Sequence, residues 1–329
     1  MLETFLATLT PMLTLFICIV IGFTLNKTKL LPSDAGSVIA KLEMWVFCPA
    51  LSFSAMSTFC TIDTIKFHAV NIVFASIVLT VEITIAILLA RVFVPQKCDE
   101  RGIYIYALAF ANYGYVGDPL VLMLFGDEVL SYFKLFCLPI TIMTYAWGIG
   151  HLMPSGEKKG GFLKNLLNPP TVAMLVGMVV GLTGIGKHMP GFLTTTLDSL
   201  KVCMGPLAMI LAGFTIADYE IKSILRDKKL YFASGLRLIV LPAILVAVAY
   251  GVKVLAATLF QMEIGHTVLY LALFATAGPL GLNTVVFPAA YGGNPKTGAG
   301  MALVSHTLCV VTIPLMYALM VMLFGPLQI

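Results

Sequence analysis

The chain has 329 residues, of which 59% are hydrophobic and 11% are charged, and its mean hydropathy is +0.98. Soluble domains carry about 25% charged residues, so this composition excludes a soluble protein and predicts one that lies in a lipid bilayer. The net charge of +4 gives no indication of nucleic-acid binding. Seven cysteines are scattered through apolar runs without paired spacing, which favours buried apolar side chains over disulfides or a metal site.

Ten apolar runs are long enough to cross a membrane, because a helix needs about 20 such residues to span the hydrocarbon core. In chain order they cover approximately residues 6–25, 35–59, 69–93, 102–125, 129–152, 168–184, 192–216, 230–255, 265–291 and 297–324. No basic segment precedes the first apolar run, and Glu3 lies just before it. We therefore expect a retained membrane span and not a cleaved signal peptide.

Basic residues in the connections predict the orientation. Connections after odd-numbered spans hold thirteen Lys or Arg residues, whereas those after even-numbered spans hold four, namely Lys66, Lys134, Lys187 and Lys253. Because cytoplasmic loops carry the excess of positive charge, the odd-numbered connections are expected in the cytoplasm and both termini outside. The longest polar connection, residues 153–167, then becomes a short cytoplasmic linker between a first five-helix repeat at 1–152 and a second at 168–329.

The two halves share an interrupted apolar segment. Residues 106–119 match residues 270–283 at one offset, with a Tyr, a Phe-Ala pair and two glycines in common, and each stretch contains Gly and Pro. The pair Pro11 and Gly22 likewise recurs as Pro170 and Gly181. An odd number of spans in each repeat requires the repeats to be inverted, as in alternating-access carriers. The expected fold is therefore an all-α polytopic membrane protein with ten transmembrane helices in two inverted five-helix repeats, in which helices 4 and 9 are broken and cross.

The predicted binding site lies where the broken helices cross. Half-helix N-termini carry partial positive charge there, which suits an anion. The candidate substrate-binding residues are Asn112, Gly114, Gly117, Asp118, Pro119, Gly278, Pro279, Gly281, Asn283 and Thr284. For the uncharged polar side chains the alternative role is to hydrogen-bond backbone groups that the prolines leave free.

Four ionisable residues within spans are candidates for ion coupling. Asp118 could take up a proton or pair with a cation, or it could cap the following half-helix. Glu82 and Arg237 occupy near-equivalent positions in the two halves and could form a buried pair or a relay. His306 could carry a proton or simply be hydrogen-bonded within the bundle.

Two further pairs of charged residues within spans are expected to have structural roles. Asp198 and Lys201 have the spacing of an intrahelical ion pair. Lys41 and Glu43 lie close enough to a span end to reach the membrane surface. The chain contains no zinc-protease, serine-hydrolase or phosphate-loop motif, so we expect neither an enzyme nor a bound metal or cofactor.

With these motifs in view, the chain resembles a prokaryotic member of the auxin efflux carrier family, the relatives of plant PIN transporters. The resemblance lies in four stretches, residues 42–51, 112–120, 236–242 and 274–317. It implies a fold like that of the bile acid:sodium symporters, with helices 1, 2, 6 and 7 as a scaffold and helices 3–5 and 8–10 as a mobile domain. Elevator-type movement would carry an organic anion, such as malate, malonate or an auxin-like acid, across a prokaryotic plasma membrane. A homodimer through the scaffold helices is one assembly to expect.

The chain departs from that family pattern at Asp118, where an apolar residue usually precedes the proline, and in its short central linker. A fixed negative charge would oppose an anion, so either Asp118 is protonated during transport or the substrate differs. The alternative functions are a membrane sensor built on a transporter fold and a proton- or sodium-coupled carrier of another small solute. A channel is disfavoured because inverted broken repeats serve alternating access.

Overall fold

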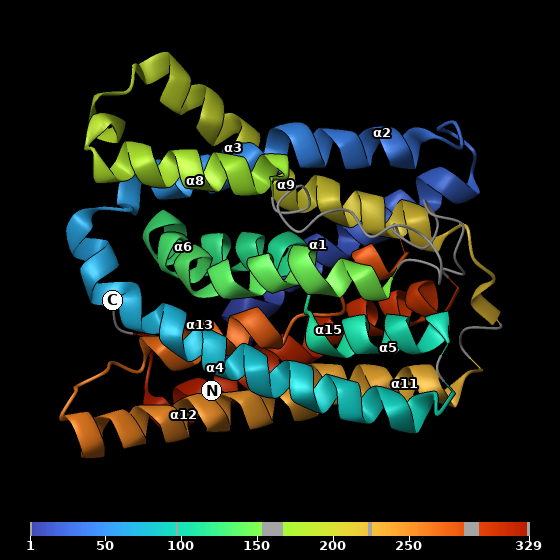
Figure 1. Cartoon of the computed structure of the whole chain (residues 1–329). Helices are drawn as coiled ribbons and strands as arrows, with labels where there is room; N and C mark the ends of the chain where they lie inside the picture. Colours follow the sequence, from blue (N-terminus) through green and yellow to red (C-terminus); the bar gives the residue numbers. More distant parts are fainter. Residues whose placement is uncertain (1, 97, 153–166, 223–225, 286–295, 328–329) are drawn as a thin grey trace.

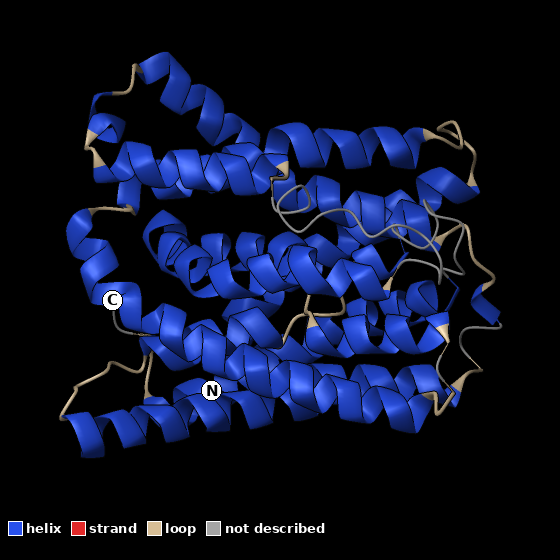
Figure 2. Ribbon diagram, in the orientation of Figure 1, coloured by secondary structure: helices blue, strands red, loops and turns tan. Residues whose placement is uncertain are grey.

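The computed structural model describes residues 2–96, 98–152, 167–222, 226–285 and 296–327, and nearly all of them are helical (Figures 1 and 2). Within these residues the β pairing is limited to one antiparallel bridge, between Ala111 and Leu280. In the described part of the chain, six helical stretches are long and apolar enough to cross a membrane, at Leu2–Lys27, Ala35–Phe59, Ala69–Phe93, Gly191–Ile216, Lys228–Phe260 and Lys296–Phe324. The chain is therefore a multi-pass membrane protein.

The helices of the first half begin with α1 (Leu2–Lys27) and a continuous stretch of α2 (Ala35–Leu42), the π-helix η1 (Glu43–Phe47) and α3 (Cys48–Phe59). There follow α4 (Ile62–Phe93), α5 (Asp99–Ala109), η2 (Tyr113–Gly117), α6 (Asp118–Met143), η3 (Thr144–Gly148) and η4 (Ile149–His151). The second half contains α8 (Pro169–Leu182), η5 (Ile185–His188), α9 (Gly191–Ile216), α11 (Lys228–Gly235), η6 (Leu236–Val240), α12 (Leu241–Phe260), α13 (Thr267–Thr276) and α15 (Lys296–Phe324).

The remaining predicted spans differ from simple membrane-crossing helices. The predicted span 102–125 is interrupted between α5 and η2, and the predicted span 265–291 is interrupted after α13. The predicted span 168–184 corresponds to α8, a shorter apolar helix. The linker predicted at 153–167 lies outside the described residues except for Leu167, as do residues 286–291 of the ninth predicted span.

A glycine reverses the chain between the fourth and fifth predicted spans. Gly126 has φ 82°, and a Cβ placed there would meet no other atom within 4 Å. Positive φ is accessible to glycine without steric cost. Here it interrupts α6, and the two parts of the helix fold back on one another.

Three π-helical turns each precede a proline by two residues. The turns η1, η2 and η6 are followed by Pro49, Pro119 and Pro242 respectively. A proline ring within a helix clashes with the carbonyl four residues earlier and removes a hydrogen-bond donor. The wider π turn absorbs that conflict, so the helix continues past the proline instead of ending.

The helices pack in two groups (Figure 1). The first group contains α1, α2, α3, α8 and α9, in which α3 packs against α8 and α9, and α1 against α9. The second group contains α4, α5, α6, α11, α12, α13 and α15, in which α4 packs against α5, α6 and α12, and α13 against α12 and α6. The groups meet where α1 contacts α15 and where α3 contacts α6.

Glycines bring the backbones of the first group close together. A Cβ at Gly22 of α1 would lie 2.0 Å from the carbonyl oxygen of Ile210, and a Cβ at Gly181 of α8 would lie 2.5 Å from that of Met56. Small residues permit such contacts between membrane helices. Because Gly22 and Gly181 are the matched glycines of the sequence repeat, the same kind of contact occurs in both halves of the chain.

Candidate functional site

The two interrupted segments hydrogen-bond to each other. The Asn112 N–H donates to the Pro279 carbonyl at 2.6 Å, and the Gly281 N–H donates to the Phe110 carbonyl at 3.4 Å. Lipid could not satisfy these backbone groups. Each interruption is therefore stabilised by the other, and the predicted contact between residues 112–119 and 278–283 is present.

Arg237 donates a hydrogen bond to the backbone carbonyl that loses its helical partner at the first interruption. In an uninterrupted helix the Asn112 N–H would donate to Leu108, four residues earlier. Instead Arg237 Nη1 donates to the Leu108 carbonyl at 3.0 Å and to Glu82 Oε1 at 2.5 Å. Both charged side chains are almost completely buried. Of the two alternatives for Glu82 and Arg237, the structure shows the buried ion pair, and it fixes the end of α5.

His306 orients Asn112. His306 Nδ1 lies 2.8 Å from the Ala302 carbonyl, and Nε2 lies 3.2 Å from Asn112 Nδ2. A carbonyl only accepts, so Nδ1 carries the hydrogen and Nε2 accepts from the amide. The Asn112 Oδ1 in turn accepts from the Tyr115 N–H at 3.3 Å, which caps η2. Asn112 thus keeps one amide hydrogen for another partner.

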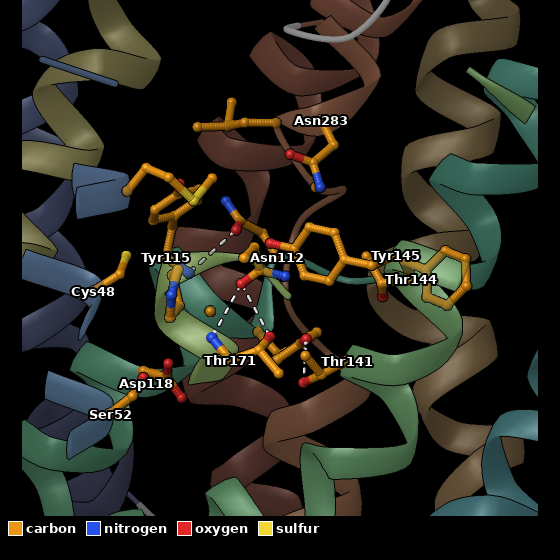
Figure 3. Close-up of a pocket in the computed structure, with 18 of the residues that line it drawn as sticks. Cys48, Ser52, Asn112, Tyr115, Asp118, Thr141, Thr144, Tyr145, Thr171 and Asn283 are labelled. Carbon is orange, nitrogen blue, oxygen red and sulfur yellow. Dashed lines mark hydrogen bonds between the residues drawn. The ribbon is translucent and has the colours of Figure 1, made fainter. Parts of the chain in front are cut away.

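A cavity of about 110 Å³ lies beside this crossing (Figure 3). A cavity needs roughly 10–15 Å³ to hold one water molecule, so this one has room for several waters or a small solute. Polar lining residues labelled in Figure 3 are Cys48, Ser52, Asn112, Tyr115, Asp118, Thr141, Thr144, Tyr145, Thr171 and Asn283. Asn112 and Asn283 lie at the two interruptions, and the others come from α3 and α8 of the first group and from η2, α6 and η3, so the cavity lies between the two groups.

Among the described residues that line the cavity, the charged ones are Asp118 and Lys134, and they form an ion pair. Asp118 is almost completely buried and Lys134 is 11% exposed. Lys134 Nζ also donates to Ser52 Oγ of α3 at 3.3 Å. Asp118 Oδ1 and Thr144 Oγ1 are buried and have no hydrogen-bond partner in the described part of the chain. The cavity walls therefore carry no net charge and hold unused hydrogen-bonding capacity.

Five of the ten predicted substrate-binding residues line the cavity. They are Asn112, Gly114, Asp118, Gly281 and Asn283. The side-chain amide of Asn283 donates to the Tyr106 hydroxyl at 2.8 Å, so residues from both interrupted segments are joined at the cavity.

The other five predicted residues lie outside the cavity lining. Gly117 faces the Phe133 ring, and Pro119 lies against Gly205 of α9. Gly278 lies near the backbone of Asn112. Pro279 contributes its carbonyl to the crossing, and the Thr284 hydroxyl donates to the Gly281 carbonyl at 2.8 Å. These five residues shape the crossing instead of facing the cavity.

Sequence reasoning missed Lys134, which it counted as a loop residue. The structure places Lys134 inside α6, in contact with Asp118. The two residues lie eight positions after and eight positions before Gly126, so a reversal at that glycine brings them side by side. That symmetry about a glycine was the available signal. Removing Lys134 from the loop count leaves the charge asymmetry thirteen to three.

The prediction for Glu43 is wrong, whereas that for Asp198 and Lys201 is confirmed. Glu43 is fully buried in η1, and within the described part of the chain its one donor is Cys48 Sγ, at 3.7 Å. The wide π turn directs this side chain into the protein, which the spacing of a regular helix did not indicate. Lys201 pairs with Asp198 at 2.8 Å and additionally with Asp127 of α6, also at 2.8 Å.

Comparison with known proteins agrees with this architecture. A family model described as "Membrane transport protein" matches the chain twice in succession, over residues 7–160 and 159–317. An uncharacterized transporter of Methanothermobacter thermautotrophicus is 26% identical over 247 residues, which cover 75% of this chain and 80% of that protein. An uncharacterized transporter of Methanocaldococcus jannaschii is 23% identical over 216 residues, covering 64% and 69% respectively. The chain belongs to the membrane transport protein family of the auxin efflux carrier type.

Proposed function

We propose that this protein is a secondary transporter that moves a small organic anion, a mono- or dicarboxylate, by elevator-type alternating access. The observation that carries the proposal is the cavity at the crossing of two interrupted segments, with walls from both helix groups. A substrate bound there would contact both groups. A displacement of one group against the other would then change the side from which the cavity is reached.

Two observations support ten helices in two inverted repeats, at 1–152 and 168–329. The family model matches each half separately, and the matched glycines Gly22 and Gly181 make equivalent close contacts. The first group holds the helices expected of the scaffold, and the second group holds those expected of the mobile domain. A homodimer would then form through the exposed faces of the first group.

The chemistry of the cavity supports an anion. The charge of Asp118 is offset by Lys134, so it does not repel a carboxylate as an isolated acid would. Asn112 has an unused amide hydrogen, and the Thr144 hydroxyl has no partner within the described residues. Uncharged donors and one lysine around a small cavity are suited to a carboxylate.

The proposed setting is the plasma membrane of a prokaryote, with the odd-numbered connections in the cytoplasm and both termini outside. The connections α1–α2 and α4–α5 lie together at the right of Figure 1, and α3–α4, α8–α9 and α12–α13 lie at the left. This separation is consistent with loop charges that distinguish the two sides. The proposal is a carrier, not an enzyme or a sensor.

The test is uptake into liposomes that contain the purified protein. A panel of labelled mono- and dicarboxylates is offered while pH and sodium are varied separately. We expect saturable uptake of at least one carboxylate. Asn112→Ala and Asn283→Ala should each reduce it, whereas Asn26→Ala, which alters an α1 residue bonded to α9 away from the cavity, should not. If no carboxylate enters, or both cavity variants retain full uptake while folded, the proposed function is wrong.

A further inference from the structure

We propose that Lys134 binds the carboxylate of the transported anion, and that Asp118 takes up one proton for each monoanion bound. This inference rests on the proposed function and adds the anchoring cation, the coupling ion and the stoichiometry. Asp118 and Lys134 lie on either side of Gly126, so the hairpin that this glycine creates in α6 brings the two groups together.

The geometry places an exchangeable cation in the cavity. A lysine ammonium has three hydrogens to donate, and Lys134 uses them toward Asp118 Oδ2 and Ser52 Oγ. One hydrogen remains for a ligand. Asp118 has a second oxygen, Oδ1, that is buried, has no partner among the described residues, and belongs to a side chain that lines the cavity.

Charge balance then requires a proton. The described residues that line the cavity include one negative and one positive group, whose charges sum to zero. Adding a monoanion alone would leave a net negative charge in a site of low dielectric constant, which is strongly unfavourable. If a proton from water bonds to the Asp118 carboxylate, the Lys134–Asp118 ion pair is replaced by a Lys134–substrate ion pair. The occupied cavity is again neutral, with one proton and one anion gained.

The other ionisable groups around the pair do not offset the anion. Those that line the cavity or interact electrostatically with the pair are Tyr106, Tyr113, Tyr115 and Tyr145, Cys48 of α3 and Cys137 of α6. Beyond these, Glu43 accepts a hydrogen bond from Cys48, and Glu82 of α4, which acts on Cys137, is already bound by Arg237. The α8 and α9 residues that line the cavity are uncharged, and α13 contains no charged residue. Glu43 is therefore the competing proton acceptor, because it is buried and forms no ion pair with any described residue.

The experiment measures acetate and malonate binding to the purified full-length protein between pH 5.5 and 8, together with proton uptake in weakly buffered solution. For the wild type we expect monoanion affinity to fall about tenfold for each pH unit above the titration of Asp118, because binding is linked to one proton. About one proton should enter per acetate bound. Infrared difference spectra should show loss of a carboxylate band and gain of a carboxylic-acid band.

The variants separate the two roles. Asp118→Asn leaves Lys134 free, so acetate should bind without proton uptake, without the carboxylic-acid band and with affinity independent of pH. Lys134→Met should lower affinity at least tenfold. Because Lys134→Met strands a buried acid, the neutral double variant Asp118→Asn/Lys134→Met provides a folded form that should also bind weakly. Lys187→Met and Asp63→Asn, at exposed positions, are the matched controls and should behave as the wild type.

Two results would overturn this inference while leaving the proposed function intact. One is that carboxylates are transported but Asp118→Asn keeps the proton uptake and pH dependence of the wild type. The other is that Glu43→Gln removes both, which would assign the proton to Glu43. Failure of every carboxylate to bind the wild type would instead contradict the proposed function, and this inference with it.

Discussion

Single residues decide whether the broken helices can exist in this fold. Arg237 replaces a backbone donor at the end of α5, and Glu82 neutralises it. Removing one member of a buried pair typically costs about 3–5 kcal/mol, whereas removing both charges costs much less. The contribution of the pair to stability is therefore best measured by comparing a variant that removes one charge with a variant that removes both.

We predict that Arg237→Gln lowers stability by about 3–5 kcal/mol because it strands Glu82. The double variant Glu82→Gln/Arg237→Gln should recover more than half of that loss. Denaturant unfolding in detergent, analysed as a double-mutant cycle, measures the coupling between the two sites. Additive losses from the two single substitutions would show that the residues do not act as a pair.

A second prediction concerns the Thr144 hydroxyl, which is buried without a partner in the described residues. Thr144→Val keeps the shape and removes the hydroxyl, so stability should stay constant or rise slightly, since an unsatisfied polar group is costly to bury. If the hydroxyl donates to the substrate, loss of one hydrogen bond of about 0.5–1.5 kcal/mol should raise the KM for uptake about 2- to 10-fold. An unchanged KM would mean that the hydroxyl does not touch the substrate.

At the scale of helices, packing depends on the glycines of the first group. A Cβ at Gly213 of α9 would lie 1.9 Å from the Ile19 carbonyl oxygen, so Gly213→Ala must push α1 and α9 apart. We predict a loss of about 1–3 kcal/mol, typical of overpacking. Gly251→Ala in α12 is the matched control. Its Cβ would meet nothing within 4 Å, and alanine favours a helix, so that variant should unfold at the same or a higher temperature.

How much of these elements the sequence predicts depends on the type of signal. Long apolar runs and Gly-Pro interruptions are local, so most spans and both interruptions could be predicted. The residue-by-residue correspondence between the two breaks could not be predicted, because the sequence match at a single offset pairs Asn112 with Thr276. In the structure Asn112 precedes the helix after the first break, and Asn283 begins the helical residues after the second. The second break is longer than the first, and sequence identity alone does not reveal that difference.

The candidate site shows the same division. Asn112 and Asn283 were predicted because they lie beside the breaks, whereas Lys134 was not, because its partnership depends on a reversal at one glycine. The burial of Glu43 depends on a π turn whose extra residue shifts the helical face. The Lys134–Asp118 contact and the burial of Glu43 depend on tertiary packing and on a backbone reversal at positive φ, which a hydropathy pattern does not reveal.

For the whole molecule, Lys201 joins the two helix groups away from the main cavity. It binds Asp198 of its own helix and Asp127 of the second group, beside a separate cavity of about 200 Å³ that includes Ser54, Phe59 and Met189. Phe59 ends α3, and Met189 follows η5 in the connection between α8 and α9, and both connections lie at the left of Figure 1. If the two groups move against each other as proposed, this ion pair would restrain them at this end.

We predict that Lys201→Gln speeds labelling of a cysteine introduced at Ser54 by a membrane-impermeant maleimide, in a background without the exposed Cys98 and Cys203. Partly exposed pairs contribute about 0.2–1 kcal/mol, so the increase should be roughly 1.5- to 5-fold. Asp198→Asn, which keeps the contact between the groups, should label at the rate of the parent. Equal rates for all three proteins would contradict a restraining role for Lys201.

The mutual bonding of the two breaks also has a consequence for biosynthesis. Asn112 and Pro279 are 167 residues apart (279 − 112), and chains grow at about 5–20 residues per second. The newly inserted first half therefore waits on the order of ten to thirty seconds before the carbonyl of Pro279 and the guanidinium of Arg237 have both been synthesised. During that interval the end of α5 and the Asn112 N–H need a temporary partner, supplied by water or by the insertion machinery. A stalled ribosome that exposes only the first half should leave this segment open to amide hydrogen exchange, and release of the full chain should close it.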